Sequence, residues 1–214
     1  MKINHPIYMV SLFLIFSYIF LFAPGDMAGN TSLILKMYSE EFRSVNPLIF
    51  SVFNLLGVWP MFYGVLVLEE SKVQEFPVWP FILLSFIAGG FVYLIYFSLR
   101  ERSLEELPLT PLQEKVEKES NMYLLLAIGL LLVLYGGILG DYGGYLRSFQ
   151  ENNLVHVMTL DFVLLSILSP NLIRDDLLRK SSYNMRRLFF NSIGSIISAL
   201  FYLVRRSEYG SVKG

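Results

Sequence analysis

The chain has 214 residues, of which 54% are hydrophobic and 16% charged, and its formal net charge is -1. The apolar residues fall in long runs, and the polar intervals between them are too short to fold on cores of their own, so we expect one domain in a lipid bilayer. The nearly neutral charge gives no support for nucleic-acid binding. The absence of cysteine excludes disulfides, thiol catalysis and cysteine-ligated metals.

The first apolar run covers residues 7–23 and is 17 residues long, which is just enough to cross a bilayer. A cleaved signal peptide is the alternative, because small residues follow at 23–25. The run is long for a signal and only Lys2 gives it a basic start, so we predict a retained span. Apolar residues at helical spacing between 33 and 38 then predict a short helix, either at the interface or on the bundle.

Residues 47–68 and 78–99 predict a pair of antiparallel spans. The first contains 22 residues, roughly 33 Å of helix. Pro60 interrupts it, and Asn54 lies on a face of small and polar residues suited to close helix contact. The second span starts near Trp79, where an interfacial aromatic residue is expected.

Residues 100–121 are rich in charges of both signs, and we predict a solvated loop there. Residues 122–139 form the most uniformly apolar run. Glycines recur along one side of this predicted helix, provided that it continues past Asp141, and they would let a neighbouring helix approach closely. These predicted packing residues are Gly129, Gly136, Gly140 and Gly144.

Residues 154–169 form a short apolar run that contains Asp161 and ends before Pro170. Its apolar residues favour insertion by roughly 3 to 6 kcal/mol, while a central aspartate costs roughly 2.5 to 3.5 kcal/mol. We therefore expect the segment to insert against other helices, with Asp161 facing inward. Two roles stay open for this acid, a structural hydrogen bond between helices or a proton or cation relay. Its expected partners are Asn54, Tyr135, Asn191 or Ser195.

Residues 171–187 are basic and amphipathic, as expected at a leaflet surface. Residues 188–204 form the last apolar run, between two arginine pairs that would reach both interfaces. Lysine and arginine divide 11 to 6 between the two sides if this run crosses, and 14 to 3 if it lies in the interface. We predict an all-α membrane bundle of about six spans, with five plus an interfacial helix as the alternative. The six spans are 7–23, 47–68, 78–99, 122–139, 154–169 and 188–204, in one domain over 1–214.

Chemistry-bearing residues are few. His5 and His156 are the only histidines, no paired-carboxylate metal site is evident, and none of the common hydrolase, metalloprotease or nucleotide-binding motifs occurs. On a helix, His156 and Asp161 lie about 140° apart, so they do not form a dyad. We predict no enzyme and no metal site. His156 as a pigment, haem or metal ligand is the alternative to a satisfied interfacial histidine, and the sequence identifies no cofactor.

Several stretches carry a family resemblance: 53–60 (FNLLGVWP), 156–162 (HVMTLDF), 174–177 (RDDL), and the final run from Arg186 to Leu203. They resemble a family of small multi-pass membrane proteins of cyanobacteria and plastids that has no assigned function. The resemblance implies a thylakoid or cyanobacterial plasma membrane and supplies no catalytic residues.

Three functions follow as hypotheses. We prefer a non-enzymatic protein that packs with, or helps to assemble, a larger membrane complex of photosynthetic type, with the bilayer and other membrane subunits as partners. A small proton-coupled carrier that uses Asp161 is the second. The third is a pigment- or quinone-binding protein that uses His156 with tyrosine and tryptophan side chains.

Overall fold

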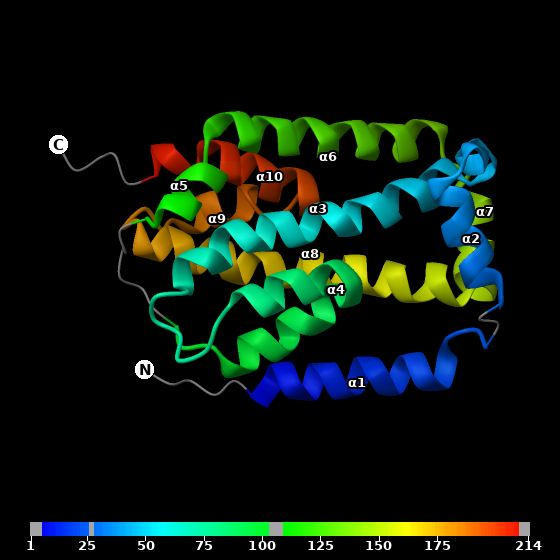
Figure 1. The fold of residues 1–214 in the computed structure, drawn as a ribbon, viewed down its shortest axis with the longest axis horizontal. Helices are drawn as coiled ribbons and strands as arrows, with labels where there is room; N and C mark the ends of the chain where they lie inside the picture. The colour runs from blue at the N-terminus through cyan, green and yellow to red at the C-terminus, as the bar shows by residue number, and fades with distance from the viewer. Residues whose placement is uncertain (1–5, 26–27, 103–108, 210–214) are drawn as a thin grey trace.

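The computed structural model describes residues 6–25, 28–102 and 109–209, and all regular structure in these ranges is helical (Figure 1). The predicted all-α class is therefore confirmed. Four of the described helices are long and apolar enough to cross a membrane, which supports the predicted membrane class. The predicted total of six spans is not confirmed. The four are α3 (Pro47–Glu70), α4 (Trp79–Leu99), α6 (Glu119–Leu139) and α8 (Asn153–Arg179).

Shorter helices accompany these four. The first of them, α1, is apolar and packs along α4, where Tyr8 meets Phe97 and Phe16 meets Phe91 with ring centroids 5.4 Å and 5.3 Å apart. The shorter helices are α1 (Pro6–Phe22), α2 (Ala28–Tyr38), η1 (Glu40–Ser44), α5 (Pro111–Val116), α7 (Tyr142–Glu151), α9 (Met185–Phe190), α10 (Ser195–Arg205) and η2 (Arg206–Glu208).

Helix α4 folds back on itself instead of crossing. At Gly89 the backbone has φ 57° and ψ -140°, a conformation that glycine adopts far more readily than other residues. The rings of Phe81 and Tyr96 lie 5.5 Å apart, whereas a straight helix would separate them by about 22 Å. The prediction that residues 78–99 span is therefore wrong, since this segment is a hairpin of two half-helices that enters and leaves at one end of the bundle (Figure 1).

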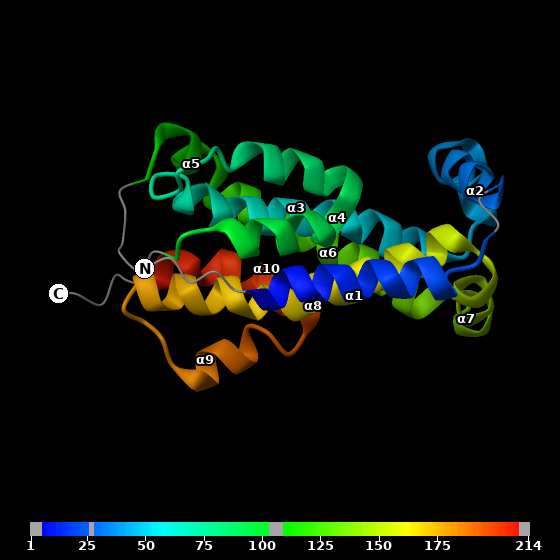
Figure 2. The ribbon, with the colours of Figure 1, turned by 90° about the horizontal axis from the view of Figure 1, so that it is seen from below.

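The last apolar run is a second hairpin. Helix α9 lies on the outside of the bundle, and α10 returns beside α8 toward the end from which α9 started (Figure 2). Ser195, at the start of the returning arm, has φ 51°. The predicted single helix over 188–204 is wrong, because the polar residues between the arms favour a turn; the Asn191 side chain, for example, donates to the Arg187 carbonyl at 2.8 Å.

Helix α8 continues through Pro170 to Arg179, so the predicted end at residue 169 is wrong, and the predicted surface stretch 171–187 is wrong for residues 171–179. Proline leaves the carbonyl of Ser166 without its usual amide donor, but the Ser169 hydroxyl donates to it at 3.1 Å. Leu172 and Leu177 beyond the proline are fully buried. Packing and a substitute hydrogen bond thus outweigh the helix-breaking tendency of proline here.

Helix α6 ends at Leu139 with Gly140 as its C-cap, so the predicted glycine ladder stops there and Gly144 lies in α7. Three of the predicted positions are close-packing sites. A Cβ atom would collide with Leu200 of α10 at Gly129, with Ser51 of α3 at Gly136, and with Leu48 of α3 at Gly140. The glycines therefore bring α6 against two different neighbours.

The topology repeats. Helices α1 and α3 run along the bundle in opposite directions, and the α4 hairpin follows them (Figures 1 and 2). Helices α6 and α8 and the α9–α10 hairpin repeat this order, and each runs in the same direction as its counterpart in the first half. Both α3 and α8 begin with an asparagine cap, in which the side chain of Asn46 accepts from the Leu48 amide and that of Asn152 from the Val155 amide. The two halves are thus related as parallel structural repeats.

Positive charge collects at the end where both hairpins open, which we call the basic end; α2 and α7 lie at the opposite end. Of the fifteen lysine and arginine residues within the described ranges, twelve lie at the basic end and three at the opposite end. The two ends therefore differ strongly in positive charge, as the positive-inside rule describes for the two sides of a membrane protein. The three are Lys36, Arg43 and Arg147; the twelve are Lys72, Arg100, Arg102, Lys115, Lys118, Arg174, Arg179, Lys180, Arg186, Arg187, Arg205 and Arg206.

Candidate functional site

Asp161 lies eight residues after the start of α8, about 12 Å along its axis, and faces inward with 5% of its surface exposed. The backbone amide of Gly90 donates to Asp161 Oδ1 at 2.6 Å. Gly90 begins the second arm of the α4 hairpin, so its amide belongs to a half-helix N-terminus. Unpaired amides and the helix dipole favour a negative charge at that position.

The Gly89-Gly90 pair explains why the hairpin approaches Asp161 so closely. A Cβ atom on Gly89 would overlap the Asp161 carboxylate, and one on Gly90 would lie 3.0 Å from Asp161 Oδ1. The positive φ at Gly89 independently requires glycine there. Two separate constraints therefore fix small residues at the tip of the hairpin.

A cavity of about 460 Å³ lies between this tip and the opposite end of the bundle. Its volume falls within the range of small-molecule sites, about 300 to 1,000 Å³. The lining is mainly apolar, and its polar side chains include Asp161, Asn54 and Ser85. The Asn54 amide donates to its own helix, at the Phe50 carbonyl, over 2.8 Å. Asp161 is therefore the one acidic side chain among the described residues that line this cavity.

None of the expected partners is hydrogen-bonded to Asp161 within the described ranges. Tyr135 packs against Phe50, Asn191 bonds to its own helix, and the Ser195 hydroxyl lies 2.7 Å from that of Ser166. The prediction of a side-chain partner is wrong, because a backbone amide takes that place. Sequence patterns did not reveal it, since the hairpin that supplies the amide was itself unforeseen.

A layer of buried aromatic rings separates Asp161 from the basic end. Trp59, Tyr63 and Tyr93 are fully buried, and the rings of Tyr63 and Tyr93 stack with centroids 4.3 Å apart. The Tyr63 hydroxyl donates to the Leu165 carbonyl of α8 at 2.7 Å. This layer lies between the Asp161 cavity and the charged groups described next.

Buried ion pairs fill the basic end, and their pattern occurs twice. Glu70, at the end of α3, accepts from the Tyr96 hydroxyl at 2.5 Å and from Arg100 at 2.7 Å. Near the end of α8, Asp176 likewise accepts from a tyrosine hydroxyl and from an arginine. The corresponding residues are Glu70 and Asp176, Tyr96 and Tyr202, and Arg100 and Arg206, each pair 106 positions apart.

Further ion pairs join the two halves. Arg179 lies 3.2 Å from Glu70 Oε1 and 3.4 Å from Asp176 Oδ1. Arg100 binds Asp175 at 2.7 Å, Arg206 binds Glu69, and Arg102 binds Asp175. We call this set the ion network; within the described ranges it comprises Glu69, Glu70, Arg100, Arg102, Glu117, Asp175, Asp176, Arg179 and Arg206.

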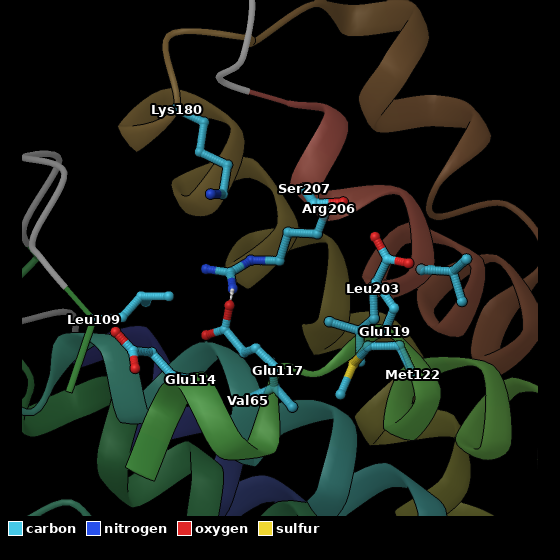
Figure 3. Close-up of a pocket in the computed structure, with 11 residues that line it drawn as sticks. Val65, Leu109, Glu114, Glu117, Glu119, Met122, Lys180, Leu203, Arg206 and Ser207 are labelled. Atoms are coloured by element: carbon cyan, nitrogen blue, oxygen red, sulfur yellow. Dashed lines mark hydrogen bonds and ion pairs between the residues drawn. The ribbon is translucent and has the colours of Figure 1, made fainter. Parts of the chain in front are cut away.

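Figure 3 shows the outer edge of the ion network, where Arg206 is paired with Glu117 at 2.5 Å. A cavity of about 320 Å³ lies there, bordered also by Glu114, Glu119 and Lys180. Among the described residues, no cluster of His, Cys, Asp and Glu has the arrangement needed to hold a metal ion. Of the acids at this edge, Glu117 is a partner of Arg206.

The arginines of the ion network stay charged. Burial alone lowers the pKa of Arg100, but Glu70 and Asp175 beside it raise that pKa above its ordinary value. Burial likewise lowers the pKa of Arg206, whereas Asp176, Glu69 and Glu117 raise it well above the ordinary value. Because both folded-state pKa values are raised, the stabilisation is fully present below the unfolded value of about 12.5 and is lost only at higher pH.

The sequence prediction missed the ion network. It left Glu69 and Glu70 in the interval between two predicted spans, and placed Arg100 in a solvated loop and Asp175 at a leaflet surface, whereas all four are buried. An acidic pair followed by Tyr-x-x-x-Arg in both halves, at a constant spacing of 106, is the signal that could have revealed it.

His156 is buried near the start of α8 and forms no ion pair with any described residue. Its Nδ1 lies 2.9 Å from the Phe149 carbonyl, and its ring stacks on Phe149 and Tyr18 at centroid distances of 4.3 Å and 5.7 Å. The Nε2 atom has no hydrogen-bond partner among the described residues. His156 does not line the Asp161 cavity, so the structure does not bring these two predicted residues together.

Comparisons of the chain with protein-family models, with curated proteins and with solved structures find no match. The fold and the site thus define a class only, an α-helical membrane protein with two folded-back hairpins and a buried acid that lines a mainly apolar cavity. The resemblance to a cyanobacterial and plastid family stays a prediction.

Proposed function

We propose that the protein is a small proton-coupled carrier that binds an apolar, positively charged ligand at Asp161. One observation supports this function above the others: Asp161 is buried beside a cavity of ligand size and forms no ion pair within the described ranges. An unpaired charge in an apolar medium is costly, so the carboxylate is expected to hold either a proton or a cation. The two compete for one group, which couples proton movement to ligand movement.

The arrangement of the helices supports the same proposal. Many transporters contain two structural repeats, with half-helices whose ends meet at a binding site inside the membrane. The α4 tip fits this pattern because its amide N-terminus points at the Asp161 carboxylate. The apolar cavity walls then suit a ligand with an apolar body, and the carboxylate suits a cationic group.

Binding is tested with tetraphenylphosphonium, an apolar cation, and with tetraphenylborate, an anion of nearly the same shape. The purified chain should bind the cation and not the anion, and lowering the pH should weaken binding because protons occupy Asp161. Asp161→Asn should reduce affinity at least tenfold while leaving the helical circular-dichroism spectrum unchanged. Glu151→Gln, which alters an exposed acid at the opposite end, is the matched control and should bind normally.

Transport is then tested in proteoliposomes with an acidic interior, where outward proton flow should drive accumulation of tetraethylammonium. Equal binding of the phosphonium and the borate, or full binding by Asp161→Asn, contradicts the proposal. The predicted role in assembling a larger complex and the predicted absence of enzymatic activity stay predictions; copurification of a stoichiometric membrane partner would favour the assembly role.

A further inference from the structure

The second hairpin holds a groove that is separate from the Asp161 cavity and from the ion network. It lies between α9 and α10, has a volume of about 550 Å³, and is lined by side chains of both arms. Three arginines border it at the basic end: Arg186 and Arg187 at the start of α9, and Arg205 at the end of α10. We propose that this groove binds the headgroup of an anionic phospholipid.

The charge of the groove is strongly positive. Against three arginines it has one acid, Glu208, which lies 3.0 Å from Arg205. Arg187 donates to the Ser182 carbonyl at 3.0 Å and lies 5.5 Å above the Tyr209 ring, which holds its guanidinium in place. Arg186 has no ion-pair partner among the described residues. Guanidinium groups bind phosphate oxygens through paired hydrogen bonds, so an anionic headgroup satisfies the surplus charge.

Along the groove, the side chains change from charged to apolar with increasing depth, as a phospholipid changes from headgroup to acyl chain. Phe190 lies about one helical turn from Arg186 and Arg187, and Phe201 lies one turn before Arg205. Both phenylalanines line the groove and remain largely exposed, at 69% and 46%. Since the hairpin enters from the basic end, its arginines are at the bilayer surface and its phenylalanines are deeper. The headgroup and the first part of an acyl chain would thus meet groups of matching polarity.

The first hairpin provides an internal contrast. At the positions 106 residues earlier, α4 has Pro80, Phe81 and Leu99 in place of the three arginines. The lipid site therefore belongs to one repeat, whereas the ion network is built from both. The three groove arginines are not needed for a hairpin to form, because α4 folds back without arginines at these positions.

The experiment is native mass spectrometry of the full chain, in neutral detergent, with equal amounts of phosphatidylglycerol and phosphatidylcholine. The chain should retain phosphatidylglycerol preferentially. Each Arg→Gln change at 186, 187 or 205 should weaken retention roughly fivefold, as expected for one surface charge, and the triple variant at least twentyfold. The triple Arg→Lys variant should keep most of the preference. Arg174→Gln, an exposed arginine at the same end but outside the groove, should leave retention unchanged.

Three results would overturn the proposal. They are equal retention of the two lipids by the unmodified chain, a loss in Arg174→Gln as large as in the triple variant, and displacement of the lipid by millimolar inorganic phosphate, which would mark a site for soluble phosphate. Because the altered arginines are exposed, the variants should keep the size-exclusion profile and helical spectrum of the unmodified chain. If the triple Arg→Gln variant loses the lipid but keeps its size-exclusion profile and helical spectrum, the result supports the assignment.

Discussion

The two hairpins are alike where they open and different where they turn. At the basic end, each is fastened by a tyrosine hydroxyl and an arginine to an acid on the preceding long helix, Glu70 in one repeat and Asp176 in the other. At the turns, the α4 hairpin brings an amide to Asp161, whereas the Ser195 hydroxyl in the second hairpin lies against that of Ser166. The position equivalent to Asp161 in α3 is Leu55, 106 residues earlier.

This difference separates structural from functional polar groups. A feature present in both repeats is best explained by a requirement common to both, which here is holding a short hairpin against a long helix. A feature present in one repeat needs another explanation, and Asp161 is such a feature. The comparison predicts that changes at the basic end reduce stability, and that changes at the α4 tip reduce ligand binding.

The largest expected effect is from breaking the ion network. Arg206→Met should destabilise the fold by about 3 to 5 kcal/mol, because Asp176 and Glu69 are left as buried charges with fewer partners. Arg100→Met should have a similar effect through Glu70 and Asp175. Unfolding in mixed micelles measures both values, and a loss below about 1 kcal/mol in only one of the two variants would show that the two halves are not held alike.

A smaller loss is expected at the turn of α4. Gly89→Ala should cost about 1 to 3 kcal/mol, since it places a side chain at φ 57° and against the Asp161 carboxylate. Gly57→Ala is the matched control, because no atom lies within 4 Å of a Cβ added there. If unfolding measurements find the two variants equally stable, the close approach of the hairpin to Asp161 is wrong.

The turn of the second hairpin should respond in the opposite direction. Ser195→Gly should stabilise the protein by a few tenths of a kcal/mol, up to about 1, because φ 51° costs serine more than glycine. Loss of the hydrogen bond to Ser166 offsets part of this gain. A thermal unfolding curve with no change, or with a loss greater than about 1 kcal/mol, would show that the hydroxyl matters more than the backbone.

The smallest change in stability is expected for Asp161→Asn. The amide oxygen still accepts from Gly90, and a neutral group is cheaper to bury, so we expect a change below about 1 kcal/mol. Cation binding should nevertheless be lost. A large destabilisation in the same unfolding assay, comparable with that of Arg206→Met, would assign Asp161 to structure instead of binding.

Composition and run length were sufficient to predict the helical membrane class, because they depend on average properties of the chain. Whether an apolar run crosses was not predictable in the same way. Residues 78–99 have the length and hydropathy of a span, yet one glycine conformation turns the chain back. The inward position of Asp161 followed from the cost of burying a charge, while its amide partner depended on that unforeseen turn.

The ion network was missed for a different reason. Its acids and arginines are far apart in sequence, from Glu69 to Arg206, and each looks like an ordinary helix-end charge within its own segment. Proline at position 170 also favoured ending the helix too early, which placed Asp175 and Asp176 at the surface instead of inside. Pairing of distant charges becomes visible only when the halves are aligned.

The folding back of both hairpins has a consequence for membrane insertion. Helices α1 and α3 run in opposite directions, as α6 and α8 do, and each hairpin opens at the basic end, so each repeat begins and ends at the same end of the bundle. A second copy joined to the first therefore starts on the same side and keeps the same orientation, with no reversal of its charge bias. Unlike repeats with an odd number of crossings, which face opposite ways when joined in tandem, such a unit can be doubled without turning inside out.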